Sequence, residues 1–300
     1  GFNEILNNSM SKTSYYKGLN VYTEETTVKV VNPLSADLGV MRQTLLFGGL
    51  ESIMRNVNRK SPNLRFFEFG NCYHYNPDKK DEDCPINAYA EETHLALWLT
   101  GKRVSGSWIH PDESTSFYEL RAYVQNILRR VGMPQGMLVM EKTDNNVFSN
   151  GIVLKNRGGK SFVEMGIVST ALLKQNDIDV PVFYADLHWD NIVKAVRKSV
   201  VSFKEISKYP SVSRDLALLL DNEIEFEQVE RVAFQSEKKL LKKVELFDVY
   251  QGDKLPVGKK SYAVNFVLQD EQATLNDKKI DAIMSKLIAN LKKQLGAELR

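Results

Sequence analysis

Residues able to bind a metal ion occur most densely between positions 72 and 94. Four of them have side chains that Zn²⁺ takes as ligands: Cys72, His74, Cys84 and His94. Structural zinc sites usually draw on tight ligand pairs, and this spacing contains no Cys-x-x-Cys pair. The pattern therefore favours a buried thiol beside a strand and a second cysteine in a loop, and we expect no metal site.

Neighbouring acidic residues could also support acid–base chemistry. Glu91 and Glu92 lie close to His94 in the chain, but such a group is typical of a solvated loop end. No combination of nucleophile, histidine and carboxylate typical of a hydrolase stands out, so we predict no catalytic residue. The basic run Lys238–Lys243 fits either contact with a phosphate backbone or an exposed turn before a strand, and the sequence leaves both open.

The composition is that of a globular chain. Its 300 residues are 43% hydrophobic and 26% charged, with a formal net charge of +2 and two cysteines. That charge does not indicate wholesale nucleic-acid binding, and two cysteines are too few for a disulfide scaffold. No apolar run approaches the roughly 18 residues that a membrane span needs, so we expect a cytoplasmic protein without membrane contact. Because the first methionine is Met10, we also expect a fragment whose N-terminal domains are missing.

Hydrophobic periodicity divides the chain into two parts that join near Arg197–Lys208. In the first part, apolar residues at helical spacing predict helices near 45–57 and 117–131, and Ser116 with Glu119 has the form of a capping box. Alternating or aromatic runs predict strands at 27–31, 63–75, 94–100, 151–155 and 161–169. No regular strand–helix–strand alternation appears, so the fold class is α+β with an antiparallel sheet.

The second part has a clearer order. Strands are expected at 214–220, 240–250 and 262–268, and helices at 226–235 and 280–295. Thr274 and Asp277 form a possible capping box for the last helix, and Gly296 ends it. With room for a short final strand at 297–300, the order is βαββαβ, a ferredoxin-like arrangement that by itself indicates no particular function.

Particular runs in the second part go beyond its fold. They are Tyr209–Ala217 (YPSVSRDLA), Leu246–Gly252 (LFDVYQG), Gly258–Ser261 (GKKS) and Gly296–Arg300 (GAELR). Together they resemble the ferredoxin-fold anticodon-binding domain of phenylalanyl-tRNA synthetases, over residues 207–300.

The first part carries a second resemblance, to the catalytic-like domain of the β subunit in the same family. It rests on Gly1–Glu4 (GFNE), Asn32–Ser35 (NPLS), Met41–Leu45 (MRQTL) and Phe66–Gly70 (FFEFG). The resemblance implies a class II synthetase fold over residues 1–198, an antiparallel sheet flanked by helices.

The same comparison indicates that this domain lacks adenylation chemistry. Active class II domains carry one arginine on a strand and another at a glycine-rich helix start, because fixed guanidinium forks stabilise charge on the nucleotide oxygens. Here Asn71–Tyr75 (NCYHY) and Phe183–Asp190 (FYADLHWD) contain no arginine, and His188 cannot supply a permanent bidentate fork. We therefore expect a domain that serves subunit contact and architecture.

In the resembling family, RNA is contacted by the aspartate of a Phe-Asp-x-Tyr strand, the serine of a Lys-Ser pair and a C-terminal arginine. By motif these are Asp248, Ser261 and Arg300, and the same runs add Arg214, Tyr250 and Lys260. Plainer roles also suit them, such as an ion pair for Asp248 and sheet packing for Tyr250. From Ser207 onward, 16 lysines and arginines accompany 15 acidic residues, which favours recognition of splayed bases over electrostatic capture.

For the whole enzyme, the resemblance implies an (αβ)₂ assembly in which the α subunit aminoacylates tRNA-Phe with ATP and magnesium, while this fragment holds no cofactor. Three alternatives stand beside it: an active single-chain synthetase of the mitochondrial type, a generic ferredoxin-like RNA-recognition module, and a purely structural subunit. The run Lys260–Val267 (KSYAVNFV) lacks the glycine pattern of an RNA-recognition motif, which weighs against the second.

Overall fold

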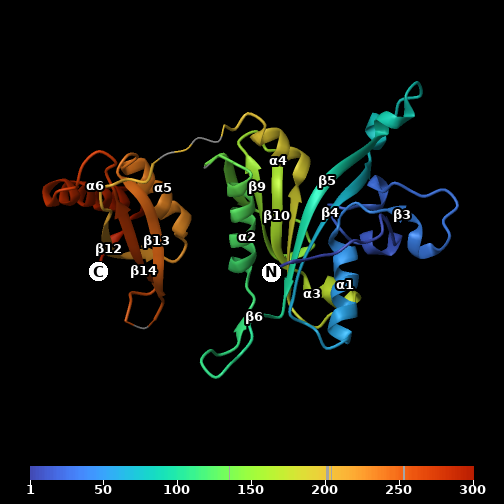
Figure 1. The fold of residues 1–300 in the computed structure, drawn as a ribbon, viewed down its shortest axis with the longest axis horizontal. Helices are drawn as coiled ribbons and strands as arrows, with labels where there is room; N and C mark the ends of the chain where they lie inside the picture. The colour runs from blue at the N-terminus through green and yellow to red at the C-terminus, as the bar shows by residue number, and fades with distance from the viewer. Residues whose placement is uncertain (135, 201–202, 204, 253) are drawn as a thin grey trace. The chain divides into compact units, whose positions relative to one another are not determined.

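The structure is a computed structural model that describes every residue except 135, 201, 202, 204 and 253 (Figure 1). The chain forms two compact units, Gly1–Val201 and Ser202–Arg300. Each unit has a hydrophobic core of its own. None of the described helices combines the length and apolarity needed to cross a bilayer.

A seven-stranded sheet forms the centre of the first unit, in the order β1-β4-β5-β11-β10-β9-β8. The bounds are β1 (Asn3–Glu4), β4 (Leu64–Tyr75), β5 (Tyr89–Thr100), β8 (Leu138–Lys142), β9 (Phe148–Asn156), β10 (Ser161–Val168) and β11 (Val182–His188). β1 runs parallel to β4, and the other neighbours are antiparallel. The expected α+β class with a mostly antiparallel sheet is confirmed.

Short elements complete this unit. Two small ribbons pair β2 (Met10–Ser11) with β3 (Val40–Met41) and β6 (Lys102–Val104) with β7 (Glu113–Ser114). Short 3-10 helices are η1 (Thr13–Tyr16), η2 (Glu24–Thr26), η3 (Ala36–Leu38), η4 (Pro77–Lys79) and η5 (Pro85–Ala88). The strand expected at 27–31 is wrong in extent, because that segment contributes a single bridge, from Lys29 to Val40.

Helices cover both faces of the sheet. α1 (Leu46–Asn58) and α3 (Thr170–Gln175) pack on the face that carries Trp98, and α2 (Phe117–Arg130) and α4 (Trp189–Val196) pack on the face that carries Leu97. β5 is therefore apolar on both sides, as expected of a central strand. Gly49 lets α1 approach closely, since a Cβ there would lie 2.1 Å from the Trp98 indole.

The predicted helix starts are partly confirmed. The Ser116 hydroxyl accepts a hydrogen bond from the Glu119 backbone N–H at 3.3 Å, which caps α2 as expected. The Glu119 carboxylate does not return the bond and instead accepts from Thr115 and Tyr123. In the second unit, Asn276 caps the last helix in place of Thr274 by accepting from the Lys279 N–H at 2.9 Å.

The second unit has the βαββαβ order that the sequence predicts. Its four strands lie in the order β13-β14-β12-β15. The elements are β12 (Val212–Asp221), α5 (Phe226–Ser236), β13 (Leu241–Tyr250), β14 (Lys259–Leu268), α6 (Asp277–Leu295) and β15 (Glu298–Leu299). Both helices pack on one face of the sheet, where inward residues of alternating positions such as Val264 and Phe266 are fully buried. No helix formed by the described residues of this unit packs on the other face, which is called the open face below (Figure 1).

Candidate functional site

Strand register gathers several of the predicted RNA-binding residues on the open face. Ser261 of β14 lies opposite Tyr250 of β13. One row further along, Ala263 of β14 lies opposite Asp248. Alternate residues of a strand point to the same face, and the neighbours Tyr262 and Val264 lie in the core, so Ser261 and Ala263 belong to the open face. Ala263 is half-buried there, and Ser261 is only 5% exposed.

Arg300 joins this group from the far edge of the sheet. Its backbone N–H donates to the carbonyl of Ala217 at 3.0 Å, so the chain end continues the pairing of β15 with β12. The guanidinium lies 5.2 Å from the centre of the Tyr250 ring, within reach of a cation–π contact. We call Asp248, Tyr250, Ser261 and Arg300 the open-face patch.

The open-face patch combines the chemistry needed to hold an unstacked base. Ala217 and Ala263 keep its floor shallow, while the Asp248 carboxylate is exposed as a hydrogen-bond acceptor. Tyr250 supplies an aromatic face and Arg300 a planar cation, both of which stack on bases. The neighbouring Phe247 is 61% exposed, which adds a second aromatic surface on the same strand.

The other two predicted residues lie elsewhere. Lys260 shares the inward parity of Tyr262, is 7% exposed, and its ammonium donates to the carbonyl of Asn222 at 2.8 Å. Arg214 bonds the Ser213 carbonyl and lies 3.9 Å from Asp277 at the start of α6. Neither side chain belongs to the open-face patch.

In the first unit, the Trp98-bearing face of the sheet holds a buried ion pair. Arg42 Nη1 lies 2.7 Å from Glu68 Oε1, and the two side chains are 7% and 0% exposed. The Arg42 Nε–H donates to the carbonyl of Asn71 at 2.9 Å, and the amide of Asn7 donates to Glu68 Oε2 at 2.6 Å. The guanidinium fork is thus bound to the protein itself and not presented to a nucleotide phosphate.

A second buried chain of polar groups follows on the same face. The Tyr184 hydroxyl donates to Asp186 Oδ2 at 3.2 Å, and Asp186 Oδ1 lies 2.6 Å from His94 Nδ1. Burial alone would lower the pKa of His94, but the carboxylates of Asp186 and Glu92 outweigh it and raise the pKa to about 10. Burial opposes ionisation of Asp186, yet its pKa is lowered because His94 compensates the charge.

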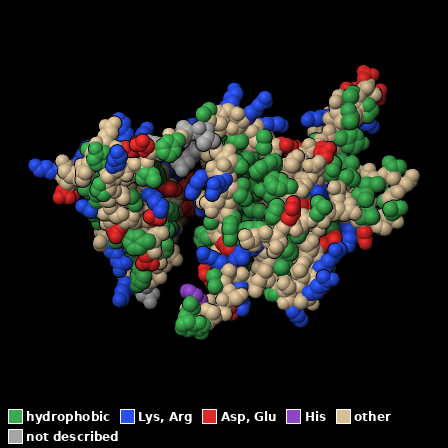
Figure 2. Space-filling view, in the orientation of Figure 1, with side chains coloured by type: hydrophobic (Ala, Val, Ile, Leu, Met, Phe, Trp, Pro, Cys, Tyr) green, Lys and Arg blue, Asp and Glu red, His purple; other side chains and the backbone are tan. Residues whose placement is uncertain are grey.

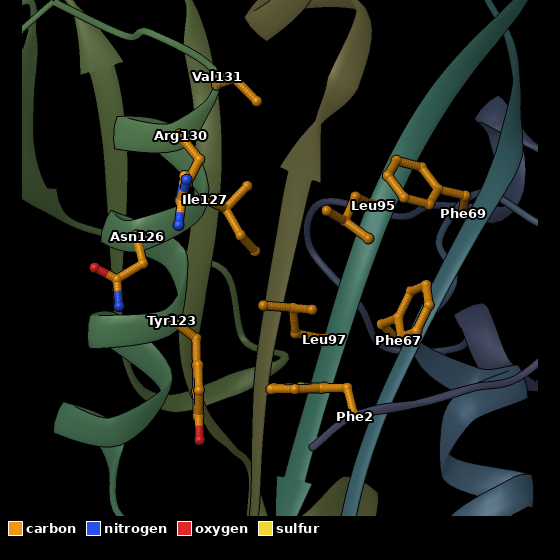
Figure 3. A pocket seen from close by; sticks show the side chains of 10 residues that line it. All are labelled: Phe2, Phe67, Phe69, Leu95, Leu97, Tyr123, Asn126, Ile127, Arg130 and Val131. Carbon is orange, nitrogen blue, oxygen red and sulfur yellow. The ribbon is translucent and has the colours of Figure 1, made fainter.

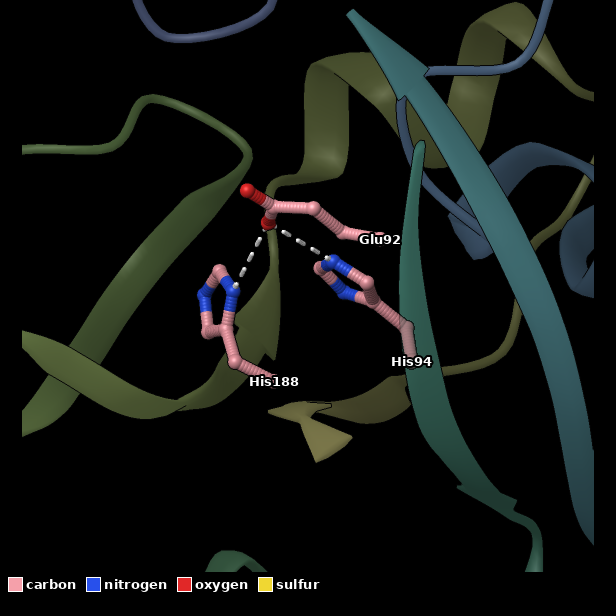
Figure 4. A group of neighbouring side chains, drawn as sticks. All are labelled: Glu92, His94 and His188. Carbon is pink, nitrogen blue, oxygen red and sulfur yellow. Dashed lines mark ion pairs between the residues drawn. The ribbon is translucent and has the colours of Figure 1, made fainter. Parts of the chain in front are cut away.

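His94 also belongs to a cluster at the point where the end of β11 meets the middle of β5. Its Nε2 lies 3.7 Å from Glu92 Oε2, and His188 Nδ1 lies 3.9 Å from the same oxygen. Figure 4 shows both imidazole rings turned toward the Glu92 carboxylate. The three ligand atoms lie within 4.8 Å of one another, and the side-chain types are those that could hold a metal ion.

This cluster differs from the four possible zinc ligands that lie close together in the sequence, Cys72, His74, Cys84 and His94. His94 is common to both, but Glu92 and His188 take the places of His74 and the cysteines. The thiols of Cys72 and Cys84 are free, the first fully buried and the second half-buried. The sequence alone gives no signal that His188 joins this cluster, because it lies 94 residues after His94 in the chain.

An apolar groove of about 390 Å³ lies on the opposite face of the sheet. Figure 3 shows it between α2 and the strands β4 and β5, and Figure 2 shows hydrophobic side chains gathered there. The lining residues are Phe2, Phe67, Phe69, Leu95, Leu97, Tyr123, Asn126, Ile127, Arg130 and Val131. This lining contains no carboxylate, histidine or thiol, so the groove suits contact with apolar groups and not acid–base catalysis.

Comparisons with known proteins give one family match for each of the two units. Residues 1–189 match the family described as "Phenylalanyl tRNA synthetase beta chain CLM domain", and residues 207–300 match "Ferredoxin-fold anticodon binding domain". Proteins named "Phenylalanine--tRNA ligase beta subunit" are similar over the whole chain, with 55% identity in Bacteroides fragilis, 47% in Porphyromonas gingivalis and 30% in Syntrophotalea carbinolica.

These matches cover 100% of this chain but 37% of the length of each of those three relatives. The first family match alone extends over more than half of the 300 residues, and the second accounts for most of the remainder. The chain therefore belongs to the phenylalanyl-tRNA synthetase β-chain family.

Proposed function

We propose that this chain works as part of the β subunit of a cytoplasmic phenylalanine–tRNA ligase, in which residues 207–300 bind the anticodon loop of tRNA-Phe. The whole enzyme would be an (αβ)₂ assembly that uses ATP and magnesium, with the chemistry on the α subunit. Residues 1–198 would form a non-catalytic domain that holds the subunits together.

The observation that carries the RNA-binding proposal is the open-face patch. The open face presents a carboxylate, an aromatic ring and a guanidinium around a floor of two alanines, and the Ser261 hydroxyl lies among them at 5% exposure. This matches the way single-stranded RNA loops are read, by stacking and by hydrogen bonds to base edges. Lys260 and Arg214 remain predictions from sequence motif, and their present contacts make them weaker candidates than the four patch residues.

The test is binding and aminoacylation of tRNA-Phe by the assembled enzyme carrying Arg300→Ala or Tyr250→Leu. Losing one base–aromatic stack costs about 1–3 kcal/mol, so each variant should weaken tRNA binding by roughly 5- to 150-fold. Arg231→Ala is the matched control, because Arg231 is an exposed arginine on α5, which packs on the helix-covered face. Equal tRNA affinity for Arg300→Ala, Tyr250→Leu and wild type would reject the proposal.

The state of Arg42 supports a non-catalytic role for the first unit. An adenylation site needs a guanidinium that meets the nucleotide phosphates, whereas this one is bound by Glu68 and the Asn71 carbonyl. Phenylalanine-dependent ATP–pyrophosphate exchange should therefore disappear when the enzyme is assembled with an inactivated α subunit. Exchange that persists would favour the alternative of an active single-chain synthetase, which the β-subunit names of the relatives do not favour.

The apolar groove supports a contact role for the same unit. Its walls of apolar and aromatic side chains would lose water when an apolar surface of the α subunit covers them. Ile127→Glu places a charge in that groove and should weaken co-purification of the α subunit. Arg157→Glu serves as a comparison, because Arg157 is exposed in the turn between β9 and β10. Unchanged assembly of Ile127→Glu would remove the groove from the interface.

A further inference from the structure

The cluster of Glu92 and His94 on β5 with His188 at the end of β11 has no part in the RNA-binding role or the subunit contact described above. We propose that Glu92, His94 and His188 bind a divalent transition-metal ion, best matched by Zn²⁺. The ion would join the two strands where α4 begins.

The buried ligand of this site is prepared for a metal. His94 is 3% exposed, and its Nε2 has no hydrogen-bond partner among the described residues. On the other side of the ring, Asp186 lies 2.6 Å from Nδ1 and is itself 2% exposed. The Asp186 carboxylate accepts from Nδ1 and fixes the orientation of the ring, as is usual for metal-binding histidines. A metal ion bound at Nε2 would displace the proton that the raised pKa of His94 keeps on that nitrogen.

The remaining two ligands can close on the ion. In a tetrahedral Zn²⁺ site, ligand atoms lie about 3.3 Å apart, given metal–ligand bonds of about 2.0–2.1 Å. The separations here are 3.7 Å from His94 to Glu92 and 3.9 Å from His188 to Glu92. The whole set of three ligand atoms lies within 4.8 Å, so the ligands must close by up to about 1.5 Å to reach the tetrahedral spacing. Glu92 and His188 are 48% and 26% exposed, so their side chains can rotate toward the ion without repacking the core.

The donor set selects the kind of ion. Two imidazoles and one carboxylate suit Zn²⁺ and its neighbours in the first transition row, whereas Ca²⁺ and Mg²⁺ prefer oxygen ligands throughout. Three protein ligands leave a fourth position, which lies toward solvent because Glu92 is half exposed. A water molecule would complete the coordination there.

The test is a titration of the full-length gene product with Zn²⁺ after removal of metals by a chelator. We expect wild type to bind one more Zn²⁺ per chain than His188→Ala or Glu92→Gln, with a dissociation constant below about 1 µM. Loss of an outer-shell partner typically weakens metal binding about 10- to 100-fold, and loss of a ligand should weaken it by at least as much. His110→Ala is the control, because His110 is an exposed histidine outside the cluster.

Two further measurements keep the proposal falsifiable. Co²⁺ bound to wild type should give visible d–d absorption typical of a tetrahedral site, and Glu92→Gln should abolish it. Trp fluorescence in the presence of chelator should show that both variants are folded. If His188→Ala is not folded, the comparison of wild type with Glu92→Gln alone tests the site. Zn²⁺ binding that is weaker than about 1 µM, or equal in wild type and Glu92→Gln, would overturn the site. His94 would then be a protonated bridge between two carboxylates.

Discussion

Replacing Arg42 by methionine should destabilise the first unit strongly. Methionine keeps the apolar stem of the side chain but removes the guanidinium, so Glu68 stays 0% exposed without its cation. Breaking a buried ion pair by removing one partner typically costs about 3–5 kcal/mol. The Asn7 side chain still donates to Glu68 at 2.6 Å, so we expect a loss near the lower end, about 3 kcal/mol.

The free energy of unfolding can be measured in this unit alone. All three tryptophans of the chain, Trp98, Trp108 and Trp189, lie within Gly1–Val201, so their fluorescence during denaturant unfolding reports on it. Adding Glu68→Met to Arg42→Met should recover about 1–4 kcal/mol, because an apolar pair no longer leaves a buried charge. A loss below about 1 kcal/mol in Arg42→Met, or no recovery in the double variant, would show that the pair is not the buried structural contact inferred here.

Two substitutions and one labelling experiment test the packing, the α2 cap and the burial of the cysteines. Gly49→Ala should cost about 1–3 kcal/mol, because its Cβ would meet an indole at 2.1 Å, while Gly158→Ala in an exposed turn should cost far less; both are measured by denaturant unfolding. Ser116→Ala should cost about 1 kcal/mol in the same assay through loss of the α2 cap, and an unchanged midpoint would count against it. A water-soluble thiol reagent should label Cys84 but not the fully buried Cys72 in native protein, and two labels before denaturation would contradict that burial.

The residues of the second unit show how far strand alternation can be trusted. The inward positions Tyr262, Val264 and Phe266 already imply that Lys260 points inward and Ser261 outward, so the buried place of Lys260 was predictable. The outward position of Asp248 was not predictable, because Leu246 points inward and simple alternation would turn Asp248 inward as well. A bulge between Leu246 and Asp248 reverses the pattern and brings the carboxylate to the open face.

The cluster in the first unit was hidden from the sequence for a different reason. His94 and His188 pair only through the register of β5 with β11, two strands that lie far apart in the chain. No spacing of ligand residues can show a register between distant strands. Spacing along the chain therefore groups His94 with His74 and the cysteines, whereas the structure places it with Glu92 and His188.

The charges on the open face bear on how RNA would be recognised there. The outward positions of the strands carry Asp215 and Glu245 near the patch, and Lys243 is paired with Glu245. A phosphate backbone would meet little net positive charge on this surface, so Coulomb attraction alone could not hold it. Arg300 is placed beside an aromatic ring instead of within a basic cluster, which suits a cation that stacks on a base. Affinity would then depend on bases leaving their own stack, and an anticodon loop presents such bases.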